Sequence, residues 1–204
     1  MLQKSALYKF LLVLFIPLLI ASCESSTDNN PSPESTAVFP NEVGDEWIYA
    51  VHDSVANSTD TLRVNIIGTI RGSGKIYKIW VRKSQTVSDT FYVTAENNNV
   101  YFYDASAPNV IDQTIEFPLV VGNYWLNPDK QFDSTIVRTR ESVTVPTDTY
   151  PDAFRLERRW GSFNVYGNST TWFVNNVGIV KFYQRIYGFD NVKETWELLS
   201  YVVL

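Results

Sequence analysis

Hydrophobic and polar residues alternate along most of the chain from residue 38 onward. Residues 62–66, Leu-Arg-Val-Asn-Ile, show the two-residue period of a strand with one buried face. Clusters of Gly, Pro or Asn interrupt the alternation about every ten residues, which is typical of antiparallel sandwiches and barrels. The alternation predicts strands at residues 47–52, 62–66, 76–81, 90–95, 100–103, 135–139, 142–145, 154–160, 171–183 (as a hairpin), 185–187 and 194–203.

The same pattern gives little support for helices. Residues 38–204 are dominated by alternating, β-branched and aromatic residues, and a short helix within 104–112 is only a weak candidate. Residues 146–151, with a proline at each end, are predicted to form a loop. We therefore predict an all-β fold, either an antiparallel sandwich or a partly open barrel.

A nine-residue pattern occurs twice in the chain. Residues 39–47 and 117–125 both contain Phe-Pro, then Val-Gly, then Trp, at the same positions. In each copy we interpret the glycine as a turn residue and the tryptophan as the anchor of the next strand. Two further matches follow in the same order along the chain, 90–103 with 171–183 and 114–117 with 195–198.

These matches favour two similar β units, residues 38–116 and 117–204, packed as one globular domain. The alternative is that the matched hairpins are alike only because alternation and Asn/Gly turns recur in any sheet protein. The length of 204 residues is compatible with one domain of ordinary size or two small ones.

The composition provides enough apolar residues for a buried core, and the charge balance restricts the classes of binding partner. Hydrophobic residues make up 45% of the chain and aromatic residues 15%, which is ample material for a buried interior. The 22 acidic residues outnumber the 17 basic ones, for a net charge of −5. An acidic chain without a basic patch is a poor candidate for nucleic acid or anionic lipid, so no nucleic-acid partner is expected.

The N-terminal end has the pattern of an export signal. Lys4 and Lys9 are followed by an apolar run over residues 10–20, which only Pro17 interrupts. A spanning helix needs about 20 apolar residues, so this run is too short to remain as a membrane anchor. We predict that residues 1–22 are a signal peptide that is removed on export.

The predicted cleavage point resembles the bacterial lipoprotein box. Residues 19–23 read Leu-Ile-Ala-Ser-Cys, and Cys23 is the only cysteine in the chain. The resemblance implies that the Cys23 thiol receives a diacylglycerol with acyl chains of the palmitate type and becomes the new N-terminus. More than one acyl chain is needed for stable anchoring, so no transmembrane segment is required. The alternative is an ordinary secreted protein with an accidental cysteine.

Residues 23–37 are predicted to be a disordered tether. They include no large apolar residue and so cannot bury enough surface to fold. As a coil, such a segment spans about 20 Å on average. Glu24 follows the cysteine, where aspartate is the usual inner-membrane retention signal of bacterial lipoproteins, so the outer membrane is favoured.

Groups for metal, cofactor or nucleophilic chemistry are scarce. His52 is the only histidine, so a zinc or copper site and a Ser-His-Asp triad are not expected. Residues 71–75 are glycine-rich but lack the spacing of a phosphate-binding loop. Calcium would need only oxygen ligands, for which Asp104, Asp112 or the loop 188–191 could serve, but no calcium-loop repeat is present. We expect no metal and no cofactor.

Two carboxylates leave a hydrolytic alternative open. Glu116 and Glu197 occupy matched positions of the two units, both within Thr-x-Glu. Paired carboxylates hydrolyse glycosidic bonds when they face one another at a suitable separation. A glycan hydrolase is therefore the alternative function, and pairing of these carboxylates with arginines on the 154–160 strand is the structural interpretation.

The last feature of the sequence that suggests a binding function is its content of aromatic residues. The chain has 6 Trp, 12 Tyr and 12 Phe, and several lie on the polar side of their predicted strands. Such rings stack on sugars, line a lipid cleft or cover a partner protein, unless both sheet faces are buried. The candidate ligand-binding residues are Trp80, Tyr101, Tyr103, Trp160 and Trp172, with Tyr92 placed similarly.

The layout as a whole resembles a family of uncharacterised lipoproteins common in Bacteroidetes-type bacteria. The resemblance is carried by the doubled Phe-Pro-x-x-x-Gly-x-x-Trp motif, by Val-Gly-Ile-Val-Lys at 177–181, and by a closing strand near Leu198. It implies an exported, lipid-anchored, non-enzymatic module that binds a glycan, a lipid or an envelope protein. The family supplies no functional residues that can be carried over.

Overall fold

The computed structural model describes residues 39–161, 165–188 and 192–204, all within one compact unit, Ser35–Leu204. These residues form β-strands and no helix. In particular, they contain no apolar helix long enough to cross a membrane. The strands are β1 (Glu46–Asp53), β2 (Ser58–Gly72), β3 (Lys75–Lys83), β4 (Ser88–Glu96), β5 (Asn99–Asp104), β6 (Ile111–Glu116), β7 (Tyr124–Leu126), β8 (Ser134–Val145), β9 (Asp148–Gly161), β10 (Tyr166–Val174), β11 (Gly178–Tyr187) and β12 (Val192–Val202).

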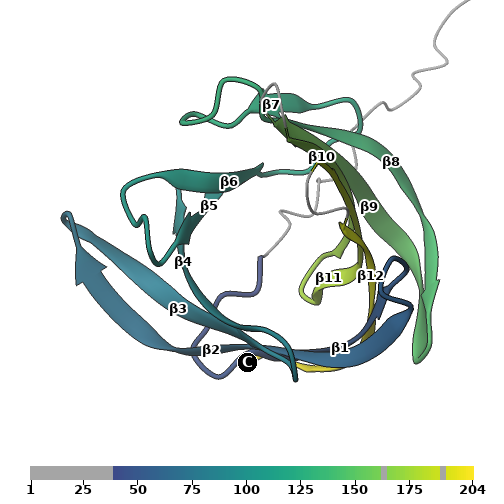
Figure 1. The fold of residues 1–204 in the computed structure, drawn as a ribbon. Helices are drawn as coiled ribbons and strands as arrows, with labels where there is room; N and C mark the ends of the chain where they lie inside the picture. The colour runs from purple at the N-terminus through teal and green to yellow at the C-terminus, as the bar shows by residue number, and fades with distance from the viewer. Residues whose placement is uncertain (1–38, 162–164, 189–191) are drawn as a thin grey trace, which may run out of the picture. The chain divides into compact units, whose positions relative to one another are not determined.

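All twelve strands belong to one antiparallel sheet that curves into a nearly closed barrel (Figure 1). The order is β6-β5-β4-β3-β2-β1-β12-β11-β10-β9-β8-β7. Each half of the chain is therefore a six-stranded meander, and the pairing of β1 with β12 joins the halves. Strands β6 and β7 are the two edges of the sheet and face each other across a gap that we call the seam.

The connections between strands gather at two ends of the barrel. The last residues of β1, β3, β5, β7, β9 and β11 lie at one end, which we call the mouth rim. The other end, the plug rim, receives the turns after β2, β4, β8 and β10, residues 39–45 before β1, residues 117–123 between β6 and β7, and the C-terminus. Both Phe-Pro segments thus enter the barrel at the plug rim.

The two Phe-Pro segments make equivalent hydrogen bonds. The Gly44 N–H donates to the Ile66 carbonyl of β2 (2.9 Å), and the Gly122 N–H donates to the Val137 carbonyl of β8 (2.8 Å). Both glycines have positive φ, 106° and 96°, a conformation that side chains disfavour. This confirms the interpretation of Gly44 and Gly122 as turn residues and explains why both copies carry glycine.

The other matched blocks also lie on corresponding strands. Trp47 lies on β1 and Trp125 on β7, the first strand of each meander. The aromatic hairpins are β4–β5 and β10–β11, and the Thr-x-Glu matches lie on β6 and β12. Shared strand order does not establish a common origin, so the duplication stays a prediction.

Aromatic side chains fill the barrel near the plug rim. The Phe39 ring lies 6.2 Å from Phe117, its counterpart in the second Phe-Pro segment, and 6.0 Å from the fully buried Phe173. It also stacks on Trp80 at 5.8 Å. A twelve-stranded barrel is wider than an eight-stranded one, whose own side chains just fill it. The Phe-Pro segments supply the additional rings that this width requires.

Side chains bridge the seam where a backbone ladder is missing. The Trp125 indole N–H donates to the Thr114 carbonyl of β6 (2.9 Å), and the Asn127 amide donates to the Asp112 carbonyl (2.8 Å). The Ile111 N–H donates to the Asp129 carboxylate (2.7 Å). These bonds satisfy edge groups of β6 that would otherwise be open to pairing with another chain.

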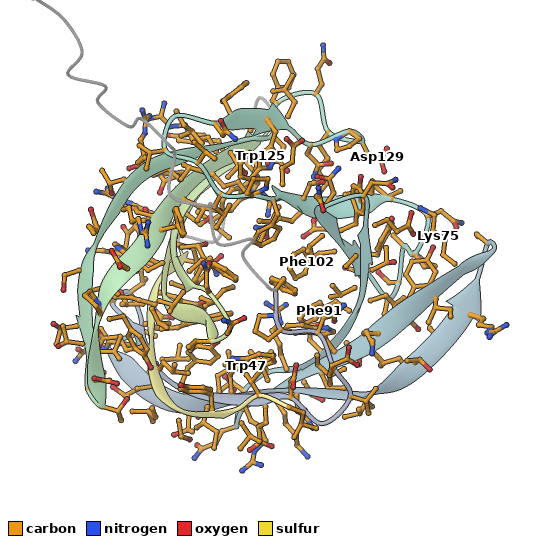
Figure 2. All side chains as sticks on the ribbon, turned by 180° about the vertical axis from the view of Figure 1, so that it is seen from behind. Trp47, Lys75, Phe91, Phe102, Trp125 and Asp129 are labelled. Carbon is orange, nitrogen blue, oxygen red and sulfur yellow. The ribbon has the colours of Figure 1, made fainter. Side chains whose placement is uncertain are left out.

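A buried ion pair lies beside these bridges. The Arg158 guanidinium on β9 donates to both carboxylate oxygens of Asp133 (2.8 and 2.6 Å) and to the Asp112 carbonyl (2.5 Å). The side chains are only 11% and 3% exposed. Because Asp133 precedes β8 and Asp112 lies on β6, this arginine links both sides of the seam. Figure 2 shows Trp125 and Asp129 on this part of the barrel.

The predicted all-β antiparallel class is confirmed, and of its two forms the structure has the partly open barrel. Two local predictions were wrong. Residues 134–145 form a single strand, β8, and the predicted loop 146–151 is a tight turn followed by β9. Pro151 is accommodated in β9 because it lies at a bulge in the β8 pairing, where no ladder hydrogen bond is needed. The segment 104–112 contains no helix: it spans the end of β5, turns and bends at 105–110, and the start of β6.

We expect Phe39→Ala to lower the free energy of unfolding by about 3 kcal/mol, the low end for a phenylalanine removed from a core, because part of the ring stays accessible. Urea denaturation followed by tryptophan fluorescence measures the change. Phe132→Ala is the control, since that side chain is 64% exposed and should change stability by less than about 0.5 kcal/mol. Equal effects of the two substitutions would refute the role of Phe39 as a plug.

Arg158→Met should destabilise the protein by about 3–5 kcal/mol, because it leaves the Asp133 charge buried without a partner. The double variant Arg158→Met/Asp133→Leu should recover part of that loss. The same substitution at Arg138, whose ion pair with Glu157 is largely exposed, should cost at most about 1 kcal/mol. Similar losses for Arg158→Met and Arg138→Met in thermal denaturation would contradict a buried link across the seam.

Candidate functional site

The barrel interior contains a cavity of about 190 Å³ between the aromatic plug and the mouth rim. Rings form much of its wall, contributed by Tyr49, Trp80, Phe91, Phe102, Phe182 and Trp196. Trp47, Phe91 and Phe102 lie on the inside of the curved sheet in Figure 2. Thr171 and Gln113 add polar groups to this wall, and Arg82, Asp89, Asp104 and Asp112 add charged ones. The ring faces of the cavity suit an apolar group, and its charged side chains suit a polar end.

A second cavity of about 240 Å³ continues toward the mouth rim. Arg82 and Trp196 line both cavities, so the two meet at these side chains. The cation of Arg82 is outnumbered by carboxylates, which are Asp53, Asp60, Asp89, Asp104, Asp112 and Glu194. An amphipathic ligand would place its apolar end inside and its polar end among these acidic groups.

Local hydrogen bonds keep two of these carboxylates charged. The Ser84 hydroxyl is the main cause that lowers the pKa of Asp60, and the Ser106 hydroxyl has the same effect on the pKa of Asp104. Arg82 forms an ion pair with Asp89, and its guanidinium lies 5.2 Å from the centre of the Phe91 ring. Asp89 thus neutralises part of the positive charge of Arg82, and the side chains at the mouth carry a net negative charge.

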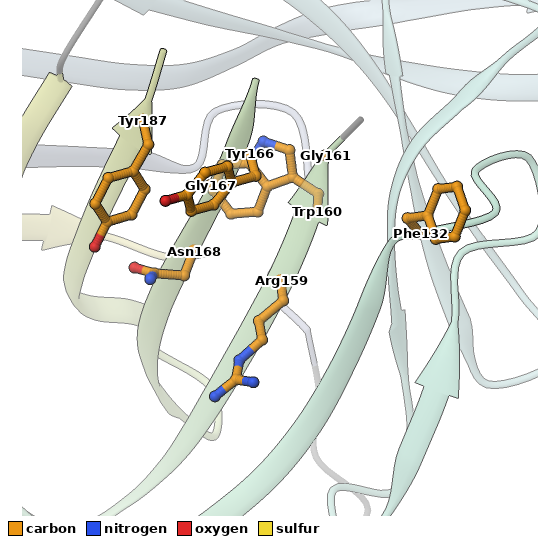
Figure 3. A pocket seen from close by; sticks show the side chains of 8 residues that line it. All are labelled: Phe132, Arg159, Trp160, Gly161, Tyr166, Gly167, Asn168 and Tyr187. Atoms are coloured by element: carbon orange, nitrogen blue, oxygen red, sulfur yellow. The ribbon is translucent and has the colours of Figure 1, made fainter. Parts of the chain in front are cut away.

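A separate cleft of about 580 Å³ lies on the strand ends of β9, β10 and β11 at the mouth rim (Figure 3). Its lining consists of Phe132, Arg159, Trp160, Gly161, Tyr166, Gly167, Asn168 and Tyr187. The Tyr166 and Tyr187 rings stack with centres 4.6 Å apart. Gly167 is packed closely under Trp160, since a Cβ there would lie 2.6 Å from the indole Cζ2. Glycine at this position therefore allows Trp160 to lie flat against β10.

A further pocket of about 520 Å³ lies at the plug rim. Phe39, Glu42, Lys78 and Leu204 are among the residues that line it, and Lys78 forms an ion pair with Glu42 (2.8 Å). The ion pair engages the charged groups of this pocket, so the pocket offers less to a ligand than the two sites at the mouth rim.

The structure separates the five aromatic candidates. Trp80 is 7% exposed, because the side of β3 that carries Lys78 and Arg82 faces the barrel interior. Its neighbours in the alternation, Lys78 and Arg82, reach opposite ends of the barrel and pair there with Glu42 and Asp89. Trp80 therefore alternates along the chain with two charged residues, although its own ring is buried in the barrel interior.

The other candidates lie in different surroundings. Tyr103 is buried, borders the inner cavity and packs edge-on against Tyr77 at 5.3 Å. Trp160 lines the cleft. Tyr101 accepts a hydrogen bond from Asn99, and Trp172 donates one to Glu141 (2.9 Å); neither lines the cavities or the cleft. Cys23 lies outside the described residues.

The two carboxylates of the hydrolytic alternative do not form a pair. Glu116 is exposed on the edge strand β6, next to the buried, inward-facing Ile115. Glu197 lies on β12 and accepts a hydrogen bond from the Lys181 ammonium (2.7 Å). Both point away from the barrel interior, from strands separated by five others in the sheet. His52 is exposed, and the described residues contain no group of His, Cys, Asp or Glu suited to a metal ion.

Sequence reasoning missed most residues of both sites. Tyr49, Phe182 and Trp196 sit in ordinary alternating strands, and nothing in the pattern distinguishes ring positions that border a void from those that fill it. Tyr166 and Tyr187 are separated along the chain and become neighbours only through the β10–β11 register. The glycines at 161 and 167 were the available signal, since glycine within a strand often marks a close approach.

No model of a known protein family matches the chain, and no curated protein matches it. Two solved structures are similar to it. One is described as an exported protein with a YmcC-like fold, from Bacteroides fragilis; it is 12% identical, with a TM-score of 0.48. The other is described as a lipoprotein, from Parabacteroides distasonis; it is 13% identical, also with a TM-score of 0.48. Each match covers 82% of this chain and 99% of that one.

Both similar proteins come from the bacterial group whose lipoproteins the sequence resembles. At this level of identity the similarity does not extend to the residues that line a site.

Proposed function

We propose that the protein is a non-enzymatic binding module that a lipid on Cys23 anchors to the outer membrane, with its ligand in the barrel interior. The anchor is supported by the signal-like residues 1–22 and by a single cysteine placed at the end of the lipobox. Residues 23–37 then act as the tether of the folded body. The aromatic-lined cavity behind an acidic mouth is the observation that carries the binding function.

The distribution of packing within the barrel supports a ligand site at the mouth. Near the plug rim, rings from both Phe-Pro segments and from the sheet pack against one another. Protein interiors are normally packed to the density of organic crystals with few voids. The cavities on the mouth side are therefore better explained as space for a ligand than as unfilled core.

The chemistry of the walls defines the ligand class. The inner cavity offers ring faces, which bind apolar or aromatic groups through burial and stacking. The mouth cavity offers several carboxylates with a single arginine that is already ion-paired. The ligand is a small amphipathic molecule with an apolar body and a neutral or cationic head, because an anionic head would be repelled.

The proposal is non-enzymatic because the geometry does not assemble a reacting group in the cavity. Glu116 and Glu197 point outward from separate strands, and the carboxylates at the mouth are spread around its rim. The cavity walls provide surfaces for burial and groups for recognition, which are the requirements of binding.

A matched series of naphthalene ligands tests the head-group preference. We expect 2-naphthylmethylamine and 2-naphthylmethanol to bind roughly tenfold or more tightly than 2-naphthoate, a difference of about 1.4 kcal/mol in binding free energy. Isothermal titration calorimetry of the soluble form, residues 24–204, measures the affinities. Tighter binding of 2-naphthoate than of the other two ligands, or no binding of any of the three, would refute the proposed ligand class.

Thr171→Phe tests whether these ligands occupy the interior. Thr171 faces the inner cavity, so the larger ring should occupy it and abolish binding. Because overpacking costs about 1–3 kcal/mol, Thr171→Leu serves as a milder variant that should weaken binding in the same direction. Thr170→Phe is the matched control, since Thr170 is the next residue of β10 and faces outward. Undiminished binding by folded Thr171→Phe protein would place the ligand elsewhere.

The anchor has its own test. Cys23→Ala in the full chain should abolish acylation and shift the protein from the membrane to soluble fractions, because no other anchor is proposed. Cell fractionation and mass spectrometry of the N-terminus provide the measurements. Unchanged membrane retention of Cys23→Ala would rule out the lipid anchor and leave the ligand-binding tests unaffected.

A further inference from the structure

Three cations and an amide stand in one row across four neighbouring strands. Arg159 of β9 is directly opposite Asn168 of β10, which is opposite Arg185 of β11, which is opposite Lys193 of β12. Directly opposite residues in antiparallel strands project from the same face, and strands lie about 4.8 Å apart. The three cations are exposed, so the row crosses the outer surface of the barrel.

The three cations of this row differ from most other Lys and Arg side chains in their lack of an ion pair among the described residues. Within the described residues, every Lys or Arg forms an ion pair with a carboxylate except Arg71, Lys83 and the three cations of the row. The chain as a whole is acidic, with a net charge of −5. Like charges side by side on adjacent strands are destabilising. Three cations in register that have no carboxylate partner among the described residues favour an anionic ligand.

An aromatic surface adjoins the row at the strand ends. Tyr166 stacks on Tyr187 with 16° between the ring planes, and the Arg185 guanidinium lies 4.4 Å from the centre of the Tyr187 ring. Figure 3 shows Trp160, Tyr166 and Tyr187 across three neighbouring strands, above Arg159 and Asn168. Tyr166 is 56% exposed although it is part of this stack. The ring faces are thus available to a flat molecule.

The cleft also has hydrogen-bonding groups without partners. The Asn168 amide and the Arg159 guanidinium make no side-chain hydrogen bond to the described part of the chain. Both residues project from the same face of the sheet and line the cleft.

We propose that this cleft and the row of cations bind an acidic oligosaccharide. Sugar rings stack on Tyr166 and Tyr187, the Asn168 amide bonds to hydroxyl groups, and Arg159, Arg185 and Lys193 pair with carboxylates or sulfates along the chain. The site lies outside the barrel and is independent of the ligand proposed for the interior.

Each component of the site narrows the ligand class. A small anion such as phosphate would use the cations but leave the rings without a role. A neutral sugar would use the rings and the amide but leave three charges unpaired. Nucleic acid carries charges and rings, but an acidic protein repels a long polyanion. A short chain of sugars that carries several anionic groups uses every component, because Arg159 and Arg185 lie two strand spacings apart and Arg185 and Lys193 lie one apart.

The test compares ligands that differ only in charge. Tetragalacturonate should bind the soluble form, residues 24–204, and its methyl ester, with the same sugar backbone and no charge, should bind at least roughly tenfold more weakly. A chondroitin sulfate tetrasaccharide is the sulfated arm, and binding of either acidic ligand supports the proposal. Calorimetry at several salt concentrations should show affinity falling as salt rises, because exposed charges are screened.

Variants locate the site. Arg159→Ala and Arg185→Ala should each weaken binding by about tenfold, the loss expected for one charge-assisted hydrogen bond. Tyr166→Ala should weaken it by about fivefold through lost stacking. Arg71→Ala removes an unpaired cation elsewhere and should leave affinity unchanged, as should Thr171→Phe in the barrel interior.

Several outcomes would overturn the assignment. These are equal binding of tetragalacturonate and its ester, no binding of either acidic oligosaccharide, or unchanged affinity of the Arg159→Ala/Arg185→Ala double variant. Binding that is confined to vesicles containing phosphatidylglycerol would show that the row recognises lipid head groups and would also refute it. None of these results bears on the interior site, whose naphthalene ligands and Thr171 variants are measured separately.

Discussion

The barrel depends on rings that come from outside its sheet. A closed sheet of twelve strands encloses more space than its inward side chains fill, and an unfilled interior loses both burial and dispersion energy. Phe39 and Phe117 meet at 6.2 Å and pack on Phe173, so two short segments complete the core at the plug rim. The same arrangement leaves the mouth side less densely filled. Stability and the interior cavity therefore have one origin, the entry of both Phe-Pro segments from the same end.

The seam shows the second constraint on this fold. Strands β1 and β12 are joined by a backbone ladder, whereas β6 and β7 meet through side chains of Trp125, Asn127 and Asp129. Arg158 and Asp133 add a buried ion pair at the same place. Such an edge is satisfied and protected, yet it rests on a few specific residues. Single substitutions there act on closure of the whole barrel, while equivalent changes on exposed strands act locally.

The two proposed sites lie on opposite faces of the same part of the sheet, strands β10 and β11. Strands β10 and β11 contribute Thr171 and Phe182 to the interior and Asn168, Arg185 and Tyr187 to the outside. The interior face is apolar because it is shielded from water, and the outer face carries charge because water and ligands reach it. A tethered barrel with an amphipathic ligand inside and a sugar chain outside would hold two kinds of envelope molecule together, each through chemistry that the other site lacks.

The amino-acid sequence alone determined most of the strands, though not β6 and β7, together with the all-β class and the two turn glycines, because alternation and positive φ are local properties. It also supplied the predictions of export and of lipid on Cys23, which depend on short contiguous motifs. The tertiary structure decided which face of each strand is inside, and so placed Trp80 in the core. It alone brought Arg159, Arg185 and Lys193 into one row. Residues on different strands become neighbours only through register, and register is set by packing of the whole sheet.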